Sequence, residues 1–219
     1  MMFDDNWDLI NGEAAHKIEH LNATNVVNLL EAVIIFYLEH IRLGRPASPP
    51  DPSVLREFHR AGTILLLASP GIYRREEVCV GNRATGVIVH QPPPWAEVEG
   101  HVETLFRELS EIWTIGDALD AAAYALWRIN WVHPFKNGNG RTARAFAYTC
   151  LCAKLAVVLP GAPTVIDQIM ATRERLGACL KQGDDTFAAS GKADLSAMKA
   201  YLFELLQIQI ASLDEPEQT

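Results

Sequence analysis

One segment of the chain, residues 133–144 (HPFKNGNGRTAR), combines residue types that could carry out chemistry on a phosphate. It contains a histidine, a Gly-Asn-Gly turn and two arginines three positions apart. Glycines let the backbone turn its N–H groups toward a ligand, and a helix that begins there adds unpaired N–H donors and a positive dipole end. Arg141 and Arg144, one helical turn apart, can present both guanidinium groups to the same anion. The segment therefore predicts a nucleotide site, with His133 as the basic group beside it.

Helices are expected on both sides of this segment. Residues 117–131 (DALDAAAYALWRINW) form an alanine-rich pattern that leads into the loop, and ARAFAYTCLCAKLAV continues beyond it with helix-forming, apolar residues. Polar starts, proline positions and apolar spacing predict the other helices. These cover residues 22–42, a stretch from about residue 53 to 68, residues 95–113, 165–181 and 195–212.

Only one stretch has the period of β-structure. VCV and GVIV are β-branched runs on either side of NRATG, which predicts a short hairpin between residues 78 and 89. Three prolines, residues 92–94, end it. The chain should therefore be almost entirely helical, with one small hairpin.

Length and composition indicate one compact domain. The chain has 219 residues, of which 49% are hydrophobic and 21% charged. Its net charge of −8 argues against binding nucleic acid through a basic surface. No apolar run approaches the roughly 20 residues needed to span a membrane, and the acidic start MMFDDNWDLI does not resemble a secretion signal. We therefore expect a cytoplasmic protein with neither nucleic acid nor membrane as a partner.

The four cysteines are expected to be reduced thiols in the core. Cys150 and Cys152 are two positions apart on a predicted helix, so they point in different directions and make a poor metal pair. Cys79 and Cys179 also lie in apolar or helical surroundings. Reduced core thiols fit a cytoplasmic protein.

The chemistry-bearing segment also resembles a known family. It matches every fixed position of HPFxxGNGRxxR, the short signature of Fic (filamentation induced by cAMP) domain proteins. GIYR at 71–74, the hairpin, the PPPWAEVEGHVETL helix and the closing ADLSAMKAYLFELL helix follow the family's order. The resemblance covers roughly residues 15–210 and implies an all-α, Fic-type domain with a short hairpin, called the flap, beside the active site.

The domain limits follow from this resemblance. Residues 1–14 are expected to be an N-terminal extension, residues 15–212 a single Fic-type domain and residues 213–219 an acidic tail. Within the domain, residues 15–43 hold the N-terminal helices with a candidate inhibitory segment, and residues 133–144 form the active-site motif.

The resemblance implies protein adenylyltransferase activity, also called AMPylation, in which AMP passes from ATP to a Ser, Thr or Tyr hydroxyl of a target protein. His133 would take the hydroxyl proton, Gly138, Asn139 and Gly140 would form the anion cradle, and Arg141 and Arg144 would hold the distal phosphates. The flap would pair with a strand-like segment of an unidentified target. Self-modification is a second expectation. The flap residues assigned to target docking are Val78, Val80, Val87 and Val89.

Asn137 departs from the stricter family form HPFx(D/E)GNGRxxR, in which the acidic residue binds Mg²⁺ on the ATP phosphates. Asparagine offers a neutral carbonyl oxygen, which can ligate a hard cation without the attraction of a charge. Three outcomes stay open: AMP transfer with weaker Mg²⁺ dependence, a different phosphate-containing donor, or an inactive relative. The inactive relative would be a silent module that binds nucleotide or a partner.

Many Fic proteins carry an inhibitory helix with the pattern (S/T)xxxE(G/N). AHKIEH keeps the Ile-Glu core of this pattern, so Glu19 would pair with Arg144 and block productive ATP binding. A solvated helix glutamate is the alternative, and Glu31 is a second, weaker candidate for the inhibitory residue.

A rival interpretation comes from the same segment. His16, Glu19 and His20 spell HxxEH, the pattern of inverted zinc peptidases, although the third ligand cannot be identified. The remaining histidines show no ligand spacing and are expected in core or surface roles: His40, His59, His90 and His101. Neither the target protein nor the oligomeric state can be read from the sequence.

Overall fold

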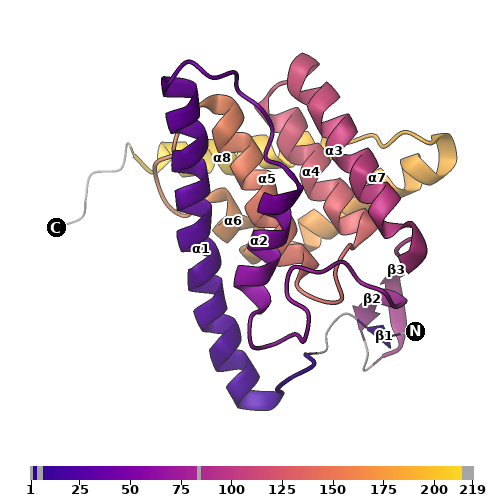
Figure 1. Cartoon of the computed structure of the whole chain (residues 1–219). Helices are drawn as coiled ribbons and strands as arrows, with labels where there is room; N and C mark the ends of the chain where they lie inside the picture. The colour runs from indigo at the N-terminus through magenta and orange to yellow at the C-terminus, as the bar shows by residue number, and fades with distance from the viewer. Residues whose placement is uncertain (1, 4–6, 83–84, 214–219) are drawn as a thin grey trace.

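Most of the chain forms α-helices packed around α5 (Asn139–Leu155), as Figure 1 shows. The computed structural model describes residues 2–3, 7–82 and 85–213. The other helices are α1 (Gly12–Arg42), α2 (Pro52–Thr63), the short 3-10 turn η1 (Trp95–Glu97), α3 (Val98–Ile115), α4 (Ala118–Val132), α6 (Val165–Ala171), α7 (Arg173–Ser190) and α8 (Ser196–Ala211). The strands are β1 (Met2–Phe3), β2 (Val78–Asn82) and β3 (Val87–His90). The prediction of a helical domain with a hairpin is confirmed.

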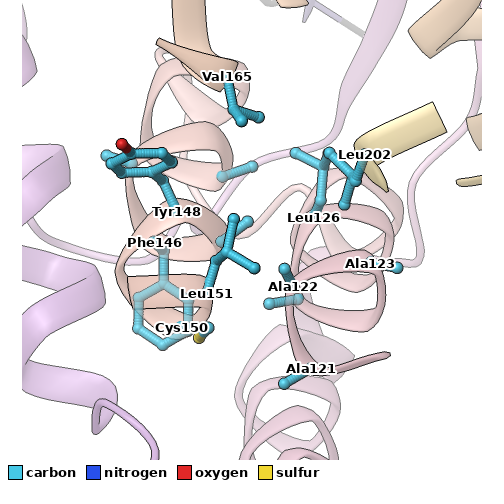
Figure 2. Packing of buried hydrophobic residues seen from close by; sticks show 14 of the residues in the cluster. Ala121, Ala122, Ala123, Leu126, Phe146, Tyr148, Cys150, Leu151, Val165 and Leu202 are labelled. Atoms are coloured by element: carbon cyan, nitrogen blue, oxygen red, sulfur yellow. The ribbon is translucent and has the colours of Figure 1, made fainter. Parts of the chain in front are cut away.

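The core is built on the pairing of α4 with α5, which make the most extensive contact between any two elements. Ala121, Ala122 and Ala125 of α4 are fully buried, and their short side chains let neighbouring helices approach closely. Figure 2 shows Leu126 and Leu151 packed between these helices, with Leu202 of α8 beside them. Both ends of the motif loop are thus anchored in the best-packed part of the molecule.

The helix before the motif begins where the sequence predicted. Asp117 accepts hydrogen bonds from the backbone N–H groups of Leu119 and Asp120, both at 2.9 Å. The Asp120 carboxylate in turn accepts from the Asp117 N–H, which completes a capping box. This reciprocal cap fixes the start of α4, and therefore the register with which it delivers His133 at its other end.

Three helices differ from the predictions. Helix α2 ends at Thr63 rather than near residue 68, and Leu65 has left-handed geometry, with φ 63°. Helix α1 begins at Gly12 rather than at residue 22, because its first turns bury only Ala15 and so carry little apolar periodicity. The predicted helix over 165–181 is wrong as a single element, since Thr172 leaves helical geometry and separates α6 from α7. Helix α7 then continues to Ser190. Neither glycine nor proline marks this break in the sequence.

The predicted flap is an antiparallel pair of β2 and β3, with a bulge between Val80 and Gly81. A Cβ on Gly81 would lie 2.2 Å from the carbonyl oxygen of Val87, so only glycine fits this close approach. The sequence did not predict β1, whose backbone pairs in parallel with β2, Met2 opposite Val78. The flap is therefore the middle and one edge of a three-stranded sheet.

The prediction that no apolar run is long enough to span a membrane is wrong for α1, which by length and composition could cross one. The helix packs against α2 and α5, burying Val26, Leu30 and Ile34. A core helix of a soluble protein can have the same length and composition, so this feature alone decides nothing about a membrane.

The cysteines are free thiols, as predicted. Cys79, Cys150 and Cys152 are buried and Cys179 is half-buried. Burial raises the pKa of the Cys152 thiol to about 11 and the pKa of Cys150 further. They behave as small apolar core residues rather than nucleophiles.

Candidate active site

The motif histidine sits where α4 ends. His133 is the C-cap of α4 in left-handed geometry (φ 49°, ψ 59°), and it is buried. Its Nδ1 lies 3.4 Å from the carbonyl oxygen of Asn130. A carbonyl can only accept, so this contact favours the proton on Nδ1 and makes Nε2 the basic nitrogen of the neutral ring.

Arg74, in the turn that precedes the flap, holds the backbone of this histidine. Its Nε donates to the carbonyl oxygen of His133 at 2.8 Å, and its backbone N–H donates to that of Pro134 at 2.9 Å. Its Nη2 donates to the carbonyl oxygen of Pro93 at 2.6 Å. Burial lowers the pKa of this guanidinium. The sequence placed Arg74 in the GIYR turn without giving it a role; its contacts join the turn, the motif loop and the chain after the flap.

The motif loop is closed by the side chain of Asn139, a residue predicted to belong to the anion cradle. Asn139 accepts from the Phe135 N–H at 2.9 Å and donates to the Phe135 carbonyl oxygen at 2.8 Å. The Asn139 side chain is buried by these contacts. Any contribution of Asn139 to an anion cradle is therefore limited to its backbone N–H.

Gly138 and Gly140 allow the close packing at the start of α5. Gly138 has φ 78°, and a Cβ there would lie 2.8 Å from Cγ2 of Thr63. A Cβ on Gly140 would lie 3.3 Å from Nη1 of Arg144, so this guanidinium folds back against the first turn of the helix. The backbone N–H groups of that turn have no partner within the helix. Arg144 thus lies against the glycine-containing start of α5.

Arg144 has an unsatisfied charge. Its Nε is buried and has no hydrogen-bond partner among the residues that the structure describes. Burial, together with the positive charges of Arg141 and Arg173, lowers the pKa of Arg144 to about 10. The guanidinium stays protonated near neutral pH. An anion bound beside it would give Nε a hydrogen-bond partner and would offset the burial of the positive charge.

Arg141, in contrast, is already engaged. Its Nη1 donates to the carbonyl oxygen of Gly62 at 2.7 Å, and its Nη2 lies 2.6 Å from Oε1 of Glu19. Glu19 therefore contacts a motif arginine, but Arg141 rather than the predicted Arg144. Glu19 is half-buried in this pair, which excludes the alternative of a glutamate solvated on an open helix face.

His59 of α2 packs against the motif loop. Its ring is fully buried and stacks on Phe135 with the centroids 3.8 Å apart. Its Nε2 lies 2.9 Å from the carbonyl oxygen of Asn137. Burial is the main cause that lowers the pKa of His59 to about 4, so the ring is neutral. The sequence predicted a core or surface role for this histidine, and its contact with the motif was missed because it joins residues 78 positions apart.

The residues around Asn137 do not supply a charged metal ligand. Its side-chain Oδ1 accepts from the Gly138 N–H at 2.5 Å, and its backbone oxygen faces His59. In the described part of the chain, no three His, Cys, Asp or Glu side chains are grouped closely enough to hold a metal ion. This donor set does not fit a protein site for Mg²⁺, which prefers carboxylates. In the rival zinc pattern Glu19 would act as the base, but its carboxylate is paired with Arg141.

A cavity of about 700 Å³ opens beside His133. Its walls come from the flap, the end of α4 and one face of α7; the main contributors are Val80, Val89, Asn130, Trp131, Leu180 and Asp184. His90 ties the flap to this wall, with Nε2 2.9 Å from the Trp131 carbonyl oxygen and Nδ1 3.2 Å from Asp184 Oδ2. The cavity is large enough for a nucleotide-sized ligand.

The four flap valines do not share one role. Val80 lines the cavity, and Val87 and Val89 are exposed, at 55% and 73%. Val78 is buried, with 1% of its surface exposed. Its side chain packs into the core, because successive residues of a strand face opposite sides and β1 covers this end of β2. The prediction that Val78 contacts a target is wrong for its side chain.

Comparisons with known proteins agree with this geometry. The Fic/DOC family matches residues 49–151. Fic-1 (residues 134–508) from C. elegans superposes with a TM-score of 0.62 at 20% identity, covering 94% of this chain and 55% of that one. A Fic domain containing signaling protein from Bacteroides thetaiotaomicron superposes with a TM-score of 0.63 at 19% identity, covering 87% and 69%.

This chain thus spans little more than half the length of that Fic-1 fragment. At these identities the superpositions establish the shared fold. No curated protein matches the sequence. Residues 49–151, which contain the motif, match the Fic/DOC family, and the fold of the chain agrees with that match.

Proposed function

We propose that the chain is a protein adenylyltransferase, which transfers AMP from ATP to a Ser, Thr or Tyr hydroxyl and releases diphosphate. One observation carries this proposal. His133 lines a cavity of about 700 Å³. The motif helix that follows begins with backbone N–H groups that have no partner within the helix, and it carries Arg144, whose Nε lacks a partner in the described structure. A base that is followed directly along the chain by a helix start and an arginine is suited to transfer of a phosphate-linked group.

In the proposed reaction, Nε2 of His133 takes the proton from the target hydroxyl. The hydroxyl oxygen forms a bond to the α-phosphorus of ATP, and the bond from that phosphorus to the oxygen bridging to the β-phosphate breaks. Diphosphate leaves with the electron pair of the broken bond. The Asn130 carbonyl oxygen holds the ring in the required tautomer. General base catalysis contributes roughly 10²–10⁴-fold, so His133 carries most of the proton chemistry.

The phosphate charge is assigned to the start of α5 and to the arginines. The backbone N–H groups of Gly138, Asn139 and Gly140 would donate to phosphate oxygens, helped by the positive end of the helix dipole. Arg144 would bind a distal phosphate and gain the partner that its Nε lacks. Since the Asn137 side chain supplies no charge, these groups stabilise the transferred phosphate without a protein carboxylate for Mg²⁺.

The contact of Glu19 with Arg141 suggests self-inhibition. A carboxylate at 2.6 Å occupies a guanidinium donor that would otherwise be available to an anion. ATP would have to displace it or bind without Arg141. In this proposal Glu19 lowers the affinity for productively bound ATP, acting on the first motif arginine instead of the second.

A second candidate function is supported by Asn137. Its Oδ1 accepts from the Gly138 N–H, one of the donors needed by a phosphate. If this contact persists when a nucleotide binds, the domain would use another phosphate-containing donor or act as a silent binding module. Binding of ATP without any transfer would distinguish this function from adenylyl transfer.

The test is an intact-mass measurement on the purified chain incubated with ATP and Mg²⁺. Three forms are compared: the unchanged chain, Glu19→Gly and His133→Ala. We expect a mass increase of one AMP, formed by self-modification, that grows in Glu19→Gly and is lost in His133→Ala. Absence of an adduct in all three forms, with ATP binding still measurable, would reject adenylyl self-transfer and favour the second candidate function.

A further inference from the structure

His59 makes more contacts with the motif loop than a core histidine needs for packing alone. Its ring stacks on Phe135 with an angle of 8° between the planes. A Cβ on Gly138 would lie 3.6 Å from His59 Cδ2 and 3.7 Å from Nε2, so a side chain at position 138 would touch the ring. His59 therefore contacts the Phe135 ring and the Asn137 carbonyl, and it lies beside Gly138.

The two ring nitrogens of His59 have opposite roles. The backbone N–H of Gly71 donates to Nδ1 at 2.8 Å, so Nδ1 must be the acceptor. The Asn137 carbonyl oxygen, 2.9 Å from Nε2, can only accept, so Nε2 must carry the proton. A single neutral tautomer satisfies both partners. His59 thereby links the motif loop to the turn that begins at Gly71 and contains Arg74, the residue that holds His133.

The bond to Asn137 also fixes the direction of the next N–H group. In a trans peptide the C=O and N–H bonds point in opposite directions. Because the Asn137 carbonyl points toward His59, the Gly138 N–H points to the opposite side of the loop. There it meets the side chain of Asn137, Oδ1 at 2.5 Å. A phosphate oxygen that replaced Asn137 Oδ1 would find this donor already oriented.

We propose that His59 is a positioning residue that orients the Asn137–Gly138 peptide, so that the Gly138 N–H faces the phosphate of the donor. The inference rests on the proposed function, because it takes this N–H to be part of the donor site. It predicts that the contact at Nε2 matters for binding a phosphate chain, while the contact at Nδ1 matters for holding the turn.

Two substitutions separate these contacts. The terminal amide of glutamine reaches the position of Nε2, so His59→Gln keeps a donor for the Asn137 carbonyl. The shorter His59→Asn reaches only the position of Nδ1, so it keeps an acceptor for the Gly71 N–H and loses the bond to Asn137. Phe58→Leu is the matched control, because Phe58 is equally buried on the same helix and packs in the core rather than on the motif loop.

The experiment measures the affinity for inorganic tripolyphosphate by calorimetry in the Glu19→Gly background, where Arg141 is released, together with the melting temperature of each variant. We expect His59→Asn to weaken binding by about tenfold, the effect of one lost hydrogen bond, and His59→Gln to stay within about threefold of its parent. Phe58→Leu should lower the melting temperature without weakening binding. Equal affinities for His59→Asn and its parent would overturn the positioning role.

The failure of this inference can be told apart from the failure of the proposed function. If the Glu19→Gly parent does not bind tripolyphosphate, the proposed donor site is wrong. If the parent binds and both His59 variants bind equally well, only the role of His59 is wrong. Should the variants not fold, nitrogen NMR of the unchanged chain gives the tautomer directly: a proton on Nε2 supports the inference, and a proton on Nδ1 contradicts it.

Discussion

Glu19, in the second turn of α1, forms an ion pair with Arg141 at the start of α5, with Nη2 and Oε1 2.6 Å apart across 122 residues of sequence. Arg141 also donates to the carbonyl oxygen of Gly62 on α2. One guanidinium thus joins three helices at the entrance to the anion cradle. Because the pair is half-buried, it is screened less than an exposed ion pair and should have a measurable effect on anion binding.

Replacing Glu19 with glycine should therefore increase activity. We expect the rate of AMP self-modification at limiting ATP to rise roughly five- to thirtyfold, the factor that corresponds to one or two kcal/mol. Glu31→Gly is the control, because Glu31 is exposed on the same helix and pays the same helix-propensity cost of about 1 kcal/mol. A rate measured over a range of ATP concentrations checks this, and an equal increase in both variants would exclude a specific contact.

Asn137 offers a test of the missing charge. Asn137→Asp keeps the shape of the side chain and adds a negative charge. The unchanged chain therefore serves as the isosteric control for this variant. We expect self-modification by Asn137→Asp to depend strongly on Mg²⁺ and, with Mg²⁺ saturating, to exceed that of the unchanged chain by about tenfold or more, since Mg²⁺ prefers carboxylate ligands. A Mg²⁺ titration of the two rates measures this. Identical curves would show that the Asn137 side chain does not face the donor.

The sequence predicted the parts of the fold that local patterns determine. The helix that begins after Asp117, the flap and the helix after the motif follow from neighbouring residues and were found where expected. The motif also identified His133, Gly138 and Arg144, because the spacing of fixed residues along a loop and a helix start is itself local. In the structure His133 lines the cavity, and Arg144 lies against Gly140 at the start of α5.

What the sequence missed depends on contacts between distant segments. The partner of Glu19 is set by how α1 crosses α2 and α5, and no pattern within α1 distinguishes Arg141 from Arg144. The side chain of Asn139 closes the loop through its bonds to Phe135, a role that the motif alone does not indicate. The strand β1 has two residues, too few for a periodic signal.

Arg74 should be essential for both stability and activity. Arg74→Lys removes the Nε donor to the His133 carbonyl and cannot reproduce the planar set of bonds to Pro93 and Val132. We expect the free energy of unfolding to fall by about 2–3 kcal/mol, because buried carbonyl groups lose charged donors. Self-modification should fall about a hundredfold as His133 loses its fixed position. Urea unfolding and intact-mass rates measure both effects; the exposed neighbour Arg75→Lys should change neither.

The low pKa of His59 predicts a pH-dependent stability. Unfolding returns the pKa from about 4 to 6.5, so between these values the unfolded chain binds a proton that the folded chain does not. The contribution of His59 to the free energy of unfolding is thus fully present above pH 6.5. It decreases by up to about 3 kcal/mol as the pH is lowered toward 4. Urea midpoints across this range should fall less steeply for His59→Gln than for the unchanged chain. Parallel curves would show that His59 titrates normally.

Gly138 provides a steric test of the motif loop. Gly138→Ala places a Cβ 2.8 Å from Cγ2 of Thr63, on a backbone with φ 78°. We expect a loss of at least 1 kcal/mol in the free energy of unfolding and a loss of tripolyphosphate binding, because Gly138 must move off α2 and its N–H then turns away from the anion. Gly100→Ala is the control: it lies within α3 with nothing near its Cβ, and alanine there should stabilise the helix by about 1 kcal/mol. Calorimetric binding and urea unfolding of both variants separate the two effects, and unchanged binding by Gly138→Ala would show that the cradle does not depend on this glycine.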